Sequence, residues 1–178
     1  MSPEAPTTVS IGAQAPDFDL PDTDGERHSL PAGEPAVVVF TCNHCPYALA
    51  WQDRVAAAAS DYAGRAHFFA INPNDSGRYP ADSYEAMQDR VRADGGWPMP
   101  YLRDETQEVA ASYGARTTPD VFVVDAEGML RYRGAPDADY RDESQNAAWL
   151  RGALDAVLEG RDPDPAATDP VGCSIKWR

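Results

Sequence analysis

The chain has 178 residues, of which 43% are hydrophobic and 25% charged, a balance typical of a folded protein rather than a disordered one. One domain with a full hydrophobic core is expected at this length. The net charge of −14 argues against nucleic acid or an anionic membrane as a partner. Three cysteines are too few, and odd in number, for a disulfide scaffold.

The hydropathy and the ends of the chain indicate where the protein acts. No apolar run approaches the length of a membrane span. The N-terminus, residues 1–6, lacks the basic and apolar regions of a signal peptide. We therefore predict a cytoplasmic protein, with a flexible arm over residues 1–11, one domain over 12–160 and a C-terminal tail over 161–178 that packs on the domain.

The first half of the chain predicts strands around one helix. Residues 12–30 contain short extended pieces around a turn at Asp22–Gly25. Residues 37–41 are apolar without alternation, as expected for a strand covered on both faces of a sheet. Apolar side chains then recur at helical spacing over 51–62, and residues 67–71 form a second buried strand.

The second half adds helices and a hairpin. After a polar loop with no assigned role, the predicted elements are a helix from Asp82 to Gly95, a shorter helix from Asp104 to Gly114, a hairpin over 121–132 and a helix over 144–159. Both earlier helices are placed by capping-box spacing, Asp82 with Glu85 and Asp104 with Gln107. This order of elements predicts an α/β fold with a mixed sheet and a right-handed crossover between its first two core strands.

Two cysteines, Cys42 and Cys45, lie between the first buried strand and the helix that follows it. A helix N-terminus offers unpaired N–H groups and the positive end of the helix dipole, which stabilise a thiolate. The thiolate is the form that attacks disulfides. The spacing C-x-x-C in this context therefore predicts a redox-active disulfide, Cys42–Cys45.

A metal site is the competing interpretation of the same pair. A closed zinc site needs four ligands, usually from two such pairs. Only Cys173 and three histidines remain as further soft ligands, and no second pair is present. We therefore expect no resident metal, while a protein that binds copper or zinc through Cys42, Cys45, His44 and Cys173 stays an alternative.

Within the pair, the sequence position assigns different roles to the two sulfurs. Cys42 precedes the helix, so we expect it to be the more exposed sulfur and the nucleophile. Cys45 lies in the first turn and would resolve a mixed disulfide on Cys42. His44, between them, is expected to stabilise the Cys42 thiolate and lower its pKa.

The dipeptide Thr118-Pro119 directly precedes the strand of the predicted hairpin. A trans proline opening an edge strand is the common arrangement. A cis peptide would instead lay the Thr118 backbone beside the sulfurs, where it would pair with the substrate backbone. Thr118 and Pro119 are therefore candidate substrate-binding residues.

These features together resemble the thioredoxin superfamily. The opening residues 12–21 resemble the AhpC/TSA, or redoxin, branch, and three motifs are similar to a bacterial peroxiredoxin-like group within it: CNHCPY, YGARTTPD and GCSIKW. The resemblance implies a thioredoxin-like fold, with a central mixed sheet flanked by helices, an N-terminal extension and a C-terminal tail. It also implies a cis peptide bond at Pro119.

Two departures from the family pattern bear on the chemistry. Peroxiredoxins carry a threonine or serine three residues before the peroxidatic cysteine, where this chain has Cys42, and their activating arginine falls at Pro119. Arg116 is a nearby substitute, although a solvated surface arginine is the more common case. Thioredoxins carry a buried acid at the position of Ala36. The first departure favours dithiol chemistry over peroxidase chemistry.

Cys173 is a candidate third redox residue, or a tail cysteine without a role. Ile175 and Trp177 beside it would anchor a tail over the active site, since an exposed tail gains nothing from a tryptophan. A disulfide would need Cα atoms within about 7 Å.

We predict a thiol–disulfide oxidoreductase that acts on a disulfide-containing protein or a small thiol, as a monomer or weak dimer and without an organic cofactor. A thiol peroxidase that reduces peroxides is the alternative enzyme.

Overall fold

The computed structural model describes residues 9–178, so most of the predicted N-terminal arm lies outside the described residues. The strands are β1 Leu20–Pro21, β2 Arg27–His28, β3 Ala36–Phe40, β4 His67–Asn72, β5 Tyr101–Arg103, β6 Thr117–Thr118, β7 Asp120–Val124, β8 Leu130–Gly134 and β9 Cys173–Ser174. The helices are α1 Pro46–Asp61, α2 Tyr84–Ala93, α3 Glu108–Tyr113 and α4 Ala148–Leu158. Two 3-10 turns, Pro80–Asp82 and Glu143–Gln145, complete the elements.

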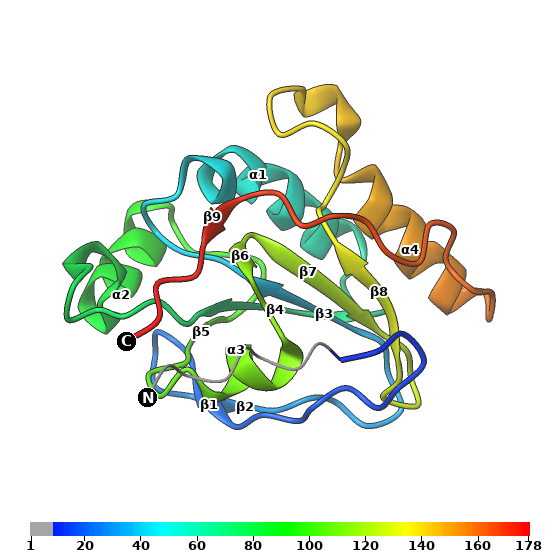
Figure 1. The fold of residues 1–178 in the computed structure, drawn as a ribbon, viewed down its shortest axis with the longest axis horizontal. Coiled ribbons are helices and arrows are strands. Elements are labelled where there is room, and N and C mark those ends of the chain that lie inside the picture. The colour runs from blue at the N-terminus through cyan, green and yellow to red at the C-terminus, as the bar shows by residue number, and fades with distance from the viewer. Residues whose placement is uncertain (1–8) are drawn as a thin grey trace.

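A five-stranded sheet in the order β5-β4-β3-β7-β8 forms the centre of the molecule (Figure 1). Strand β3 runs parallel to β4 and antiparallel to β7, and β7 and β8 form the predicted hairpin. The sheet is therefore mixed, and α1 provides the crossover between the parallel pair. The α/β prediction is confirmed.

Strand β3 is central because both of its faces are apolar. Val37 and Val39 pack with side chains of α1 and α4, whereas Val38 and Phe40 pack on the opposite face of the sheet. All five residues of the strand are buried. This two-sided burial explains the lack of polar alternation in its sequence.

Helices and short segments cover the two faces of the sheet. In Figure 1, α1 and α4 lie on one side, while α3 and the β1–β2 pair lie on the other. The first layer contributes Val55 and Leu154 to the core, and the second contributes Phe18 and Tyr113. Because the sheet fixes the end of β3 between these layers, it also fixes the loop that carries the cysteines.

Three helix starts differ from the prediction. Helix α2 is capped by Ser83, whose hydroxyl accepts the Ala86 N–H at 3.1 Å, so Asp82 is not the cap. Helix α3 begins at Glu108, after Gln107 adopts a left-handed φ of 66°. Helix α4 begins at Ala148 rather than at 144.

The reason for the late start of α4 is backbone conformation. Asn146 and Ala147 have φ angles of 54° and 53° and so interrupt the helix that the apolar pattern predicts. The buried Ala147 N–H instead donates to Asp137 at 2.9 Å.

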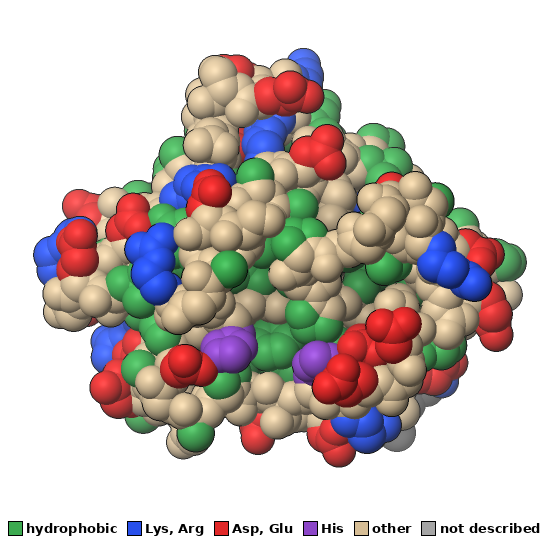
Figure 2. Space-filling model, turned by 180° about the vertical axis from the view of Figure 1, so that it is seen from behind, with side chains coloured by type: hydrophobic (Ala, Val, Ile, Leu, Met, Phe, Trp, Pro, Cys, Tyr) green, Lys and Arg blue, Asp and Glu red, His purple; other side chains and the backbone are tan. Residues whose placement is uncertain are grey.

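Within residues 9–178, no helix is long and apolar enough to cross a membrane. Acidic and basic side chains are interspersed on the face drawn in Figure 2, which shows no single basic patch.

Candidate active site

The cysteine loop links the carboxyl end of β3 to the start of α1. Cys45 is the N-cap residue of α1, and Pro46 occupies the first helical position, where its missing N–H costs no hydrogen bond. Both thiols are reduced, and both cysteines are 0% exposed. The expectation that Cys42 is the more exposed sulfur is therefore wrong, because other parts of the chain cover the loop.

Thr118 contacts both sulfurs. Its hydroxyl lies 3.3 Å from Cys42 Sγ, and its carbonyl accepts a hydrogen bond from the Cys45 thiol at 3.2 Å. The Thr118–Pro119 peptide bond is cis, as the family resemblance implied. A dipeptide 73 or more residues away in sequence is thus brought against the cysteine pair.

A buried acid, Asp82, supports the loop from the other side. One of its carboxylate oxygens accepts the Asn43 N–H at 2.6 Å, and the other forms an ion pair with His44 Nδ1. Asn72 and Asn74, from the end of β4 and the loop after it, each donate an amide hydrogen bond of 3.1 Å to this carboxylate. The imidazole of His44 also stacks on Tyr79, with ring centroids 5.5 Å apart.

A hydrogen bond joins the two thiols of the pair. The Cys42 thiol donates to Cys45, and mainly for this reason the pKa of Cys45 is lowered to about 4. Burial opposes this shift, while Cys173 and the first-turn N–H of Ala48 add to it. The pKa of Cys42 is raised by the same hydrogen bond, then by burial, and also by the nearby charge of Asp82.

The directions of these two pKa shifts differ from the roles predicted for Cys42 and His44. His44 was expected to lower the pKa of Cys42, but its imidazole is paired with Asp82, whose negative charge acts in the opposite sense. The Thr118 hydroxyl favours a Cys42 thiolate, and His44 favours it only through its backbone N–H. When Cys45 ionises it gives up its hydrogen bond to Thr118, and the donors from Cys42, Cys173 and Ala48 replace it. These hydrogen bonds favour the thiolate on Cys45.

Three of these groups have the chemistry of metal ligands. Cys42, His44 and Asp82 each offer one ligand atom, and these atoms lie within 4.8 Å of one another. Thiolate, imidazole and carboxylate all bind zinc, but a closed site takes four ligands. The Asp82 oxygens are already occupied by the Asn43 N–H and two amide groups. These hydrogen bonds account for the buried Asp82 carboxylate as a support of the loop, and no metal is needed to explain its position.

The C-terminal tail completes the site. Strand β9 pairs antiparallel with β6, which places Cys173 opposite Thr118. Cys173 packs against the cluster of Cys42, Cys45 and Ala48, and its side chain shares a hydrogen bond with Cys45. Ile175 is 3% exposed. The tail therefore brings Cys173, from the far end of the chain, to the Cys42–Cys45 pair.

The sequence analysis did not identify the polar residues that hold the loop. Asp82 was assigned to a helix cap, and Asn72 and Asn74 to a loop without a role. Their one signal in the sequence is that polar residues follow the buried strand β4 directly, at the same sheet edge as the cysteine loop. Arg116, the candidate peroxide-activating residue, is exposed, and its carbonyl accepts the Ile175 N–H at 3.1 Å.

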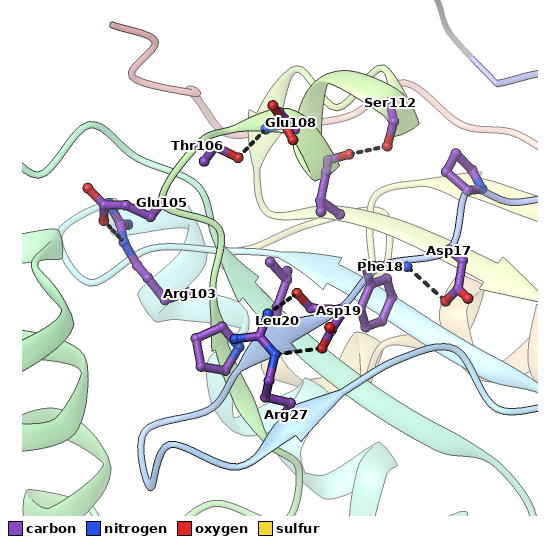
Figure 3. Close-up of a pocket in the computed structure, with 13 residues that line it drawn as sticks. Asp17, Phe18, Asp19, Leu20, Arg27, Arg103, Glu105, Thr106, Glu108 and Ser112 are labelled. Atoms are coloured by element: carbon purple, nitrogen blue, oxygen red, sulfur yellow. Dashed lines mark hydrogen bonds and ion pairs between the residues drawn. The ribbon is translucent and has the colours of Figure 1, made fainter.

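A cavity away from the cysteines has no part in this site. It has a volume of about 670 Å³ and is lined by the stretch from Pro16 to Pro21, by Arg27 and by the region around α3, without any cysteine (Figure 3). Its arginines are paired within the wall: Arg27 with Asp19 at 2.8 Å and Arg103 with Glu105 at 2.9 Å. It offers no reactive group, so the cysteine cluster is the candidate active site.

Residues 11–133 match the sequence model of the AhpC/TSA family, and this range includes the cysteine loop and β7. The chain belongs to the AhpC/TSA family. Two solved structures resemble it over nearly the whole length. A hypothetical protein from Sinorhizobium meliloti 1021 is 36% identical with a TM-score of 0.89, covering 97% of each chain. An uncharacterized conserved protein from Geobacillus kaustophilus is 39% identical with a TM-score of 0.88, covering 95% of this chain and 93% of that one.

More distant structures show the fold alone. A putative thiol:disulfide interchange protein DsbE from Chlorobium tepidum has a TM-score of 0.67 at 19% identity, covering 85% of this AhpC/TSA chain and 99% of its own. The thioredoxin-like fold is thereby confirmed. A comparison with curated proteins finds no similar sequence.

Proposed function

We propose that this AhpC/TSA protein is a thiol–disulfide oxidoreductase whose working group is the Cys42–Cys45 dithiol. The observation that carries the proposal is the packing of the Cys42 and Cys45 thiols together at the start of α1, both in contact with Thr118, and the lowered pKa of Cys45 agrees with it. A thiolate at neutral pH attacks disulfides, and an adjacent thiol can resolve the product. No organic cofactor is needed, because the electrons pass through sulfur.

The reaction would proceed by two exchange steps. The Cys45 thiolate attacks one sulfur of a substrate disulfide, forms a mixed disulfide and releases the other substrate sulfur as a thiolate. Cys42 then loses its proton and attacks Cys45 Sγ, which forms Cys42–Cys45 and releases the second substrate thiolate. The substrate gains two electrons and the protein loses them. The Asp82 carboxylate, within 4.8 Å of Cys42 Sγ, is positioned to take the proton that Cys42 gives up.

The substrate class follows from the surroundings of the pair. Thr118 presents its backbone directly beside the sulfurs, and an extended peptide paired with it would bring its own cysteine to Cys45. We therefore propose a disulfide-containing protein or a small disulfide as the partner, held at Thr118 and Pro119.

Trapping of mixed disulfides tests the proposal. The double variant Cys42→Ser/Cys173→Ser, offered a disulfide substrate, should accumulate a mixed disulfide on Cys45, which mass spectrometry locates, because neither neighbouring thiol remains to resolve it. Cys45→Ser/Cys173→Ser should trap little, since burial and the charge of Asp82 still raise the pKa of Cys42, its one remaining thiol. Wild-type protein titrated against glutathione should form Cys42–Cys45 in one two-electron step. Absence of that bond at every glutathione ratio would contradict the proposal, and trapping only on Cys42 would restore the roles predicted from sequence.

Peroxide reduction is the second candidate, favoured by the complete burial of both sulfurs, because a small oxidant reaches a covered thiolate more readily than a protein does. The Cys45 thiolate would attack the peroxide and become a sulfenic acid, with an alcohol or water leaving. A neighbouring thiol would then form a disulfide and release water. Within residues 9–178, however, neither sulfur has an arginine side chain as a hydrogen-bond partner. Peroxide consumption coupled to a thiol reductant measures this activity directly.

Metal binding is tested separately, because Cys42 and His44 belong to the ligand group described above. Protein purified with reductant and without chelator should carry well under one zinc or copper ion per chain. A stoichiometric metal that protects Cys42 from alkylation would favour the metal-binding alternative.

A further inference from the structure

The C-terminal strand occupies the edge at which a substrate strand would pair. β9 forms an antiparallel pair with β6 in the register Thr118 opposite Cys173 and Thr117 opposite Ser174. The Thr118 backbone is the edge proposed to bind the substrate. A segment of the chain itself, with a cysteine at the central position, thus already lies there (Figure 1).

The fit of this segment is close on both sides of Cys173. A β-carbon added at Gly172 would overlap the carbonyl group of Thr118, so the backbones approach as closely as glycine permits. Beyond Cys173, the Ile175 N–H donates to the Arg116 carbonyl at 3.1 Å, and the Ile175 side chain is buried.

Lys176 fixes the end of the segment by its backbone. Its N–H donates to the Asn74 side chain at 3.0 Å, and its carbonyl accepts from the Asp75 N–H and from Gln107, both at 2.8 Å. Asn74 also contacts Asp82, so the tail and the support of the cysteine loop share a residue. The docking is therefore built from several elements of the domain rather than from one contact.

We propose that residues 172–176 are a tethered pseudosubstrate, in which Cys173 takes the position of a substrate cysteine and exchanges with the Cys42–Cys45 disulfide. This inference rests on the proposed function, and it adds a third redox residue and a built-in competitor for the substrate. It also accounts for the burial of both active-site sulfurs beneath the docked tail.

The exchange balances without an outside reagent. Once a substrate has oxidised the pair, the Cys173 thiolate attacks Cys45 Sγ. The Cys45–Cys173 bond forms, the Cys42–Cys45 bond breaks, and Cys42 leaves as a thiolate that takes up the proton lost by Cys173. No electrons are gained or lost overall. Burial and the neighbouring Cys45 thiolate raise the pKa of Cys173 to about 11 in the reduced protein, and oxidation removes that thiolate charge.

Disulfide mapping of three full-length proteins tests the exchange and separates it from the proposed function. After oxidation with oxidised glutathione, wild type should contain both Cys42–Cys45 and Cys45–Cys173, and Cys42→Ser should contain Cys45–Cys173 as its main product. If Cys42→Ser gives only glutathione adducts with Cys173 free, the pseudosubstrate is overturned. Cys173→Ser reports on the proposed function alone, since failure to form Cys42–Cys45 there contradicts the dithiol and not the tail.

A variant that leaves every thiol in place tests the docking. Gly172→Ala forces the tail away from Thr118, whereas Gly152→Ala in α4 adds a methyl group to open space and serves as the matched control. We expect Gly172→Ala to raise the alkylation rate of Cys45 by about tenfold or more, because the covered sulfur opens more often, and to reduce the yield of Cys45–Cys173. Equal alkylation rates and equal yields in wild type, Gly172→Ala and Gly152→Ala would overturn the proposal.

Discussion

The buried carboxylate of Asp82 accepts a hydrogen bond of 2.6 Å from the backbone N–H of Asn43, the residue that follows Cys42. The same carboxylate pairs with His44 and raises the pKa of Cys42. One side chain thus holds the loop between the two cysteines and helps to decide which cysteine keeps the proton. Shape and protonation of the site are linked through this group.

Asp82→Asn should therefore change both properties. Without the negative charge the pKa of Cys42 falls, and an amide nitrogen facing the donors of Asn43, Asn72 and Asn74 costs about 1–3 kcal/mol of stability. The pKa of Cys42 is measured by the pH dependence of alkylation in a Cys45→Ala background. Urea unfolding measures the stability. Asp89→Asn is the control, because Asp89 lies on the exposed side of α2. An unchanged Cys42 pKa would contradict the electrostatic role.

The thiolate of Cys45 should be visible over most of the pH range. With a pKa of about 4, reduced protein at pH 7 carries one thiolate, which disappears only as the pH falls through about 4. Thiolate ultraviolet absorbance reports this directly. Cys42→Ala removes the main hydrogen-bond donor to Cys45 and should raise its pKa. Absorbance that appears only near the ordinary thiol pKa of about 8.5 would refute the coupled pair.

The sequence predicts those parts of the fold that depend on local pattern. The buried strands β3 and β4, the hairpin and the end of α3 at Gly114 all follow from apolar runs and turn residues close in the chain. Gly114, for example, adopts the φ of 65° that a helix end of this kind requires. The prediction that Asp82 caps α2 also rested on local spacing and is wrong, because its carboxylate binds a backbone N–H 39 residues away.

The candidate site divides in the same way. The cysteine spacing and the Thr118–Pro119 dipeptide identify where the chemistry lies, since each motif is short and self-contained. The order of the thiol pKa values does not follow from spacing, because it depends first on which thiol of the pair donates to the other and on burial, and then on Asp82 and Cys173, both distant in sequence. Sequence position favours Cys42 as the thiolate, whereas the hydrogen bonding in the structure favours Cys45, and the trapping experiment decides between them.

A buried ion pair joins α1 to the loop before α4. Asp137 accepts hydrogen bonds from Trp51 at 2.9 Å, from Arg54 at 2.9 and 3.1 Å and from the Ala147 N–H. Asp137→Ala leaves the Arg54 charge buried without its partner, which should cost about 3–5 kcal/mol in the free energy of unfolding. Urea denaturation measures this loss. Asp162→Ala, at a side chain 93% exposed, should change stability by less than about 0.5 kcal/mol. A similarly small loss in Asp137→Ala would show that the loop is held by other contacts.

The two ends of β7 should respond oppositely to pH. Burial raises the pKa of Asp120 to about 6, although Arg133 lies 3.5 Å from it. For Asp125, burial is outweighed by hydrogen bonds from the Met129 N–H and Arg131, so its pKa is lowered. A carboxyl group whose pKa is raised by folding contributes stability at a pH below its pKa in the unfolded chain, and this contribution is lost as the pH rises through its pKa in the folded protein. A carboxyl group whose pKa is lowered by folding contributes stability that is lost only as the pH falls through its pKa in the folded protein.

Between pH 4.5 and 7.5, the Asp120 contribution should therefore decline by about 2 kcal/mol, given about 1.4 kcal/mol for each tenfold difference in proton affinity. The Asp125 contribution should stay nearly constant. Urea unfolding of wild type, Asp120→Asn and Asp125→Asn at both pH values isolates the two, because the general effect of the −14 net charge is shared by all three proteins. The free energy of unfolding of Asp120→Asn minus that of wild type should be larger at pH 7.5 than at pH 4.5. The loss in free energy of unfolding of Asp125→Asn relative to wild type should be the same at both pH values. A pH-independent difference for Asp120→Asn would mean that Arg133 compensates the burial of Asp120 in full.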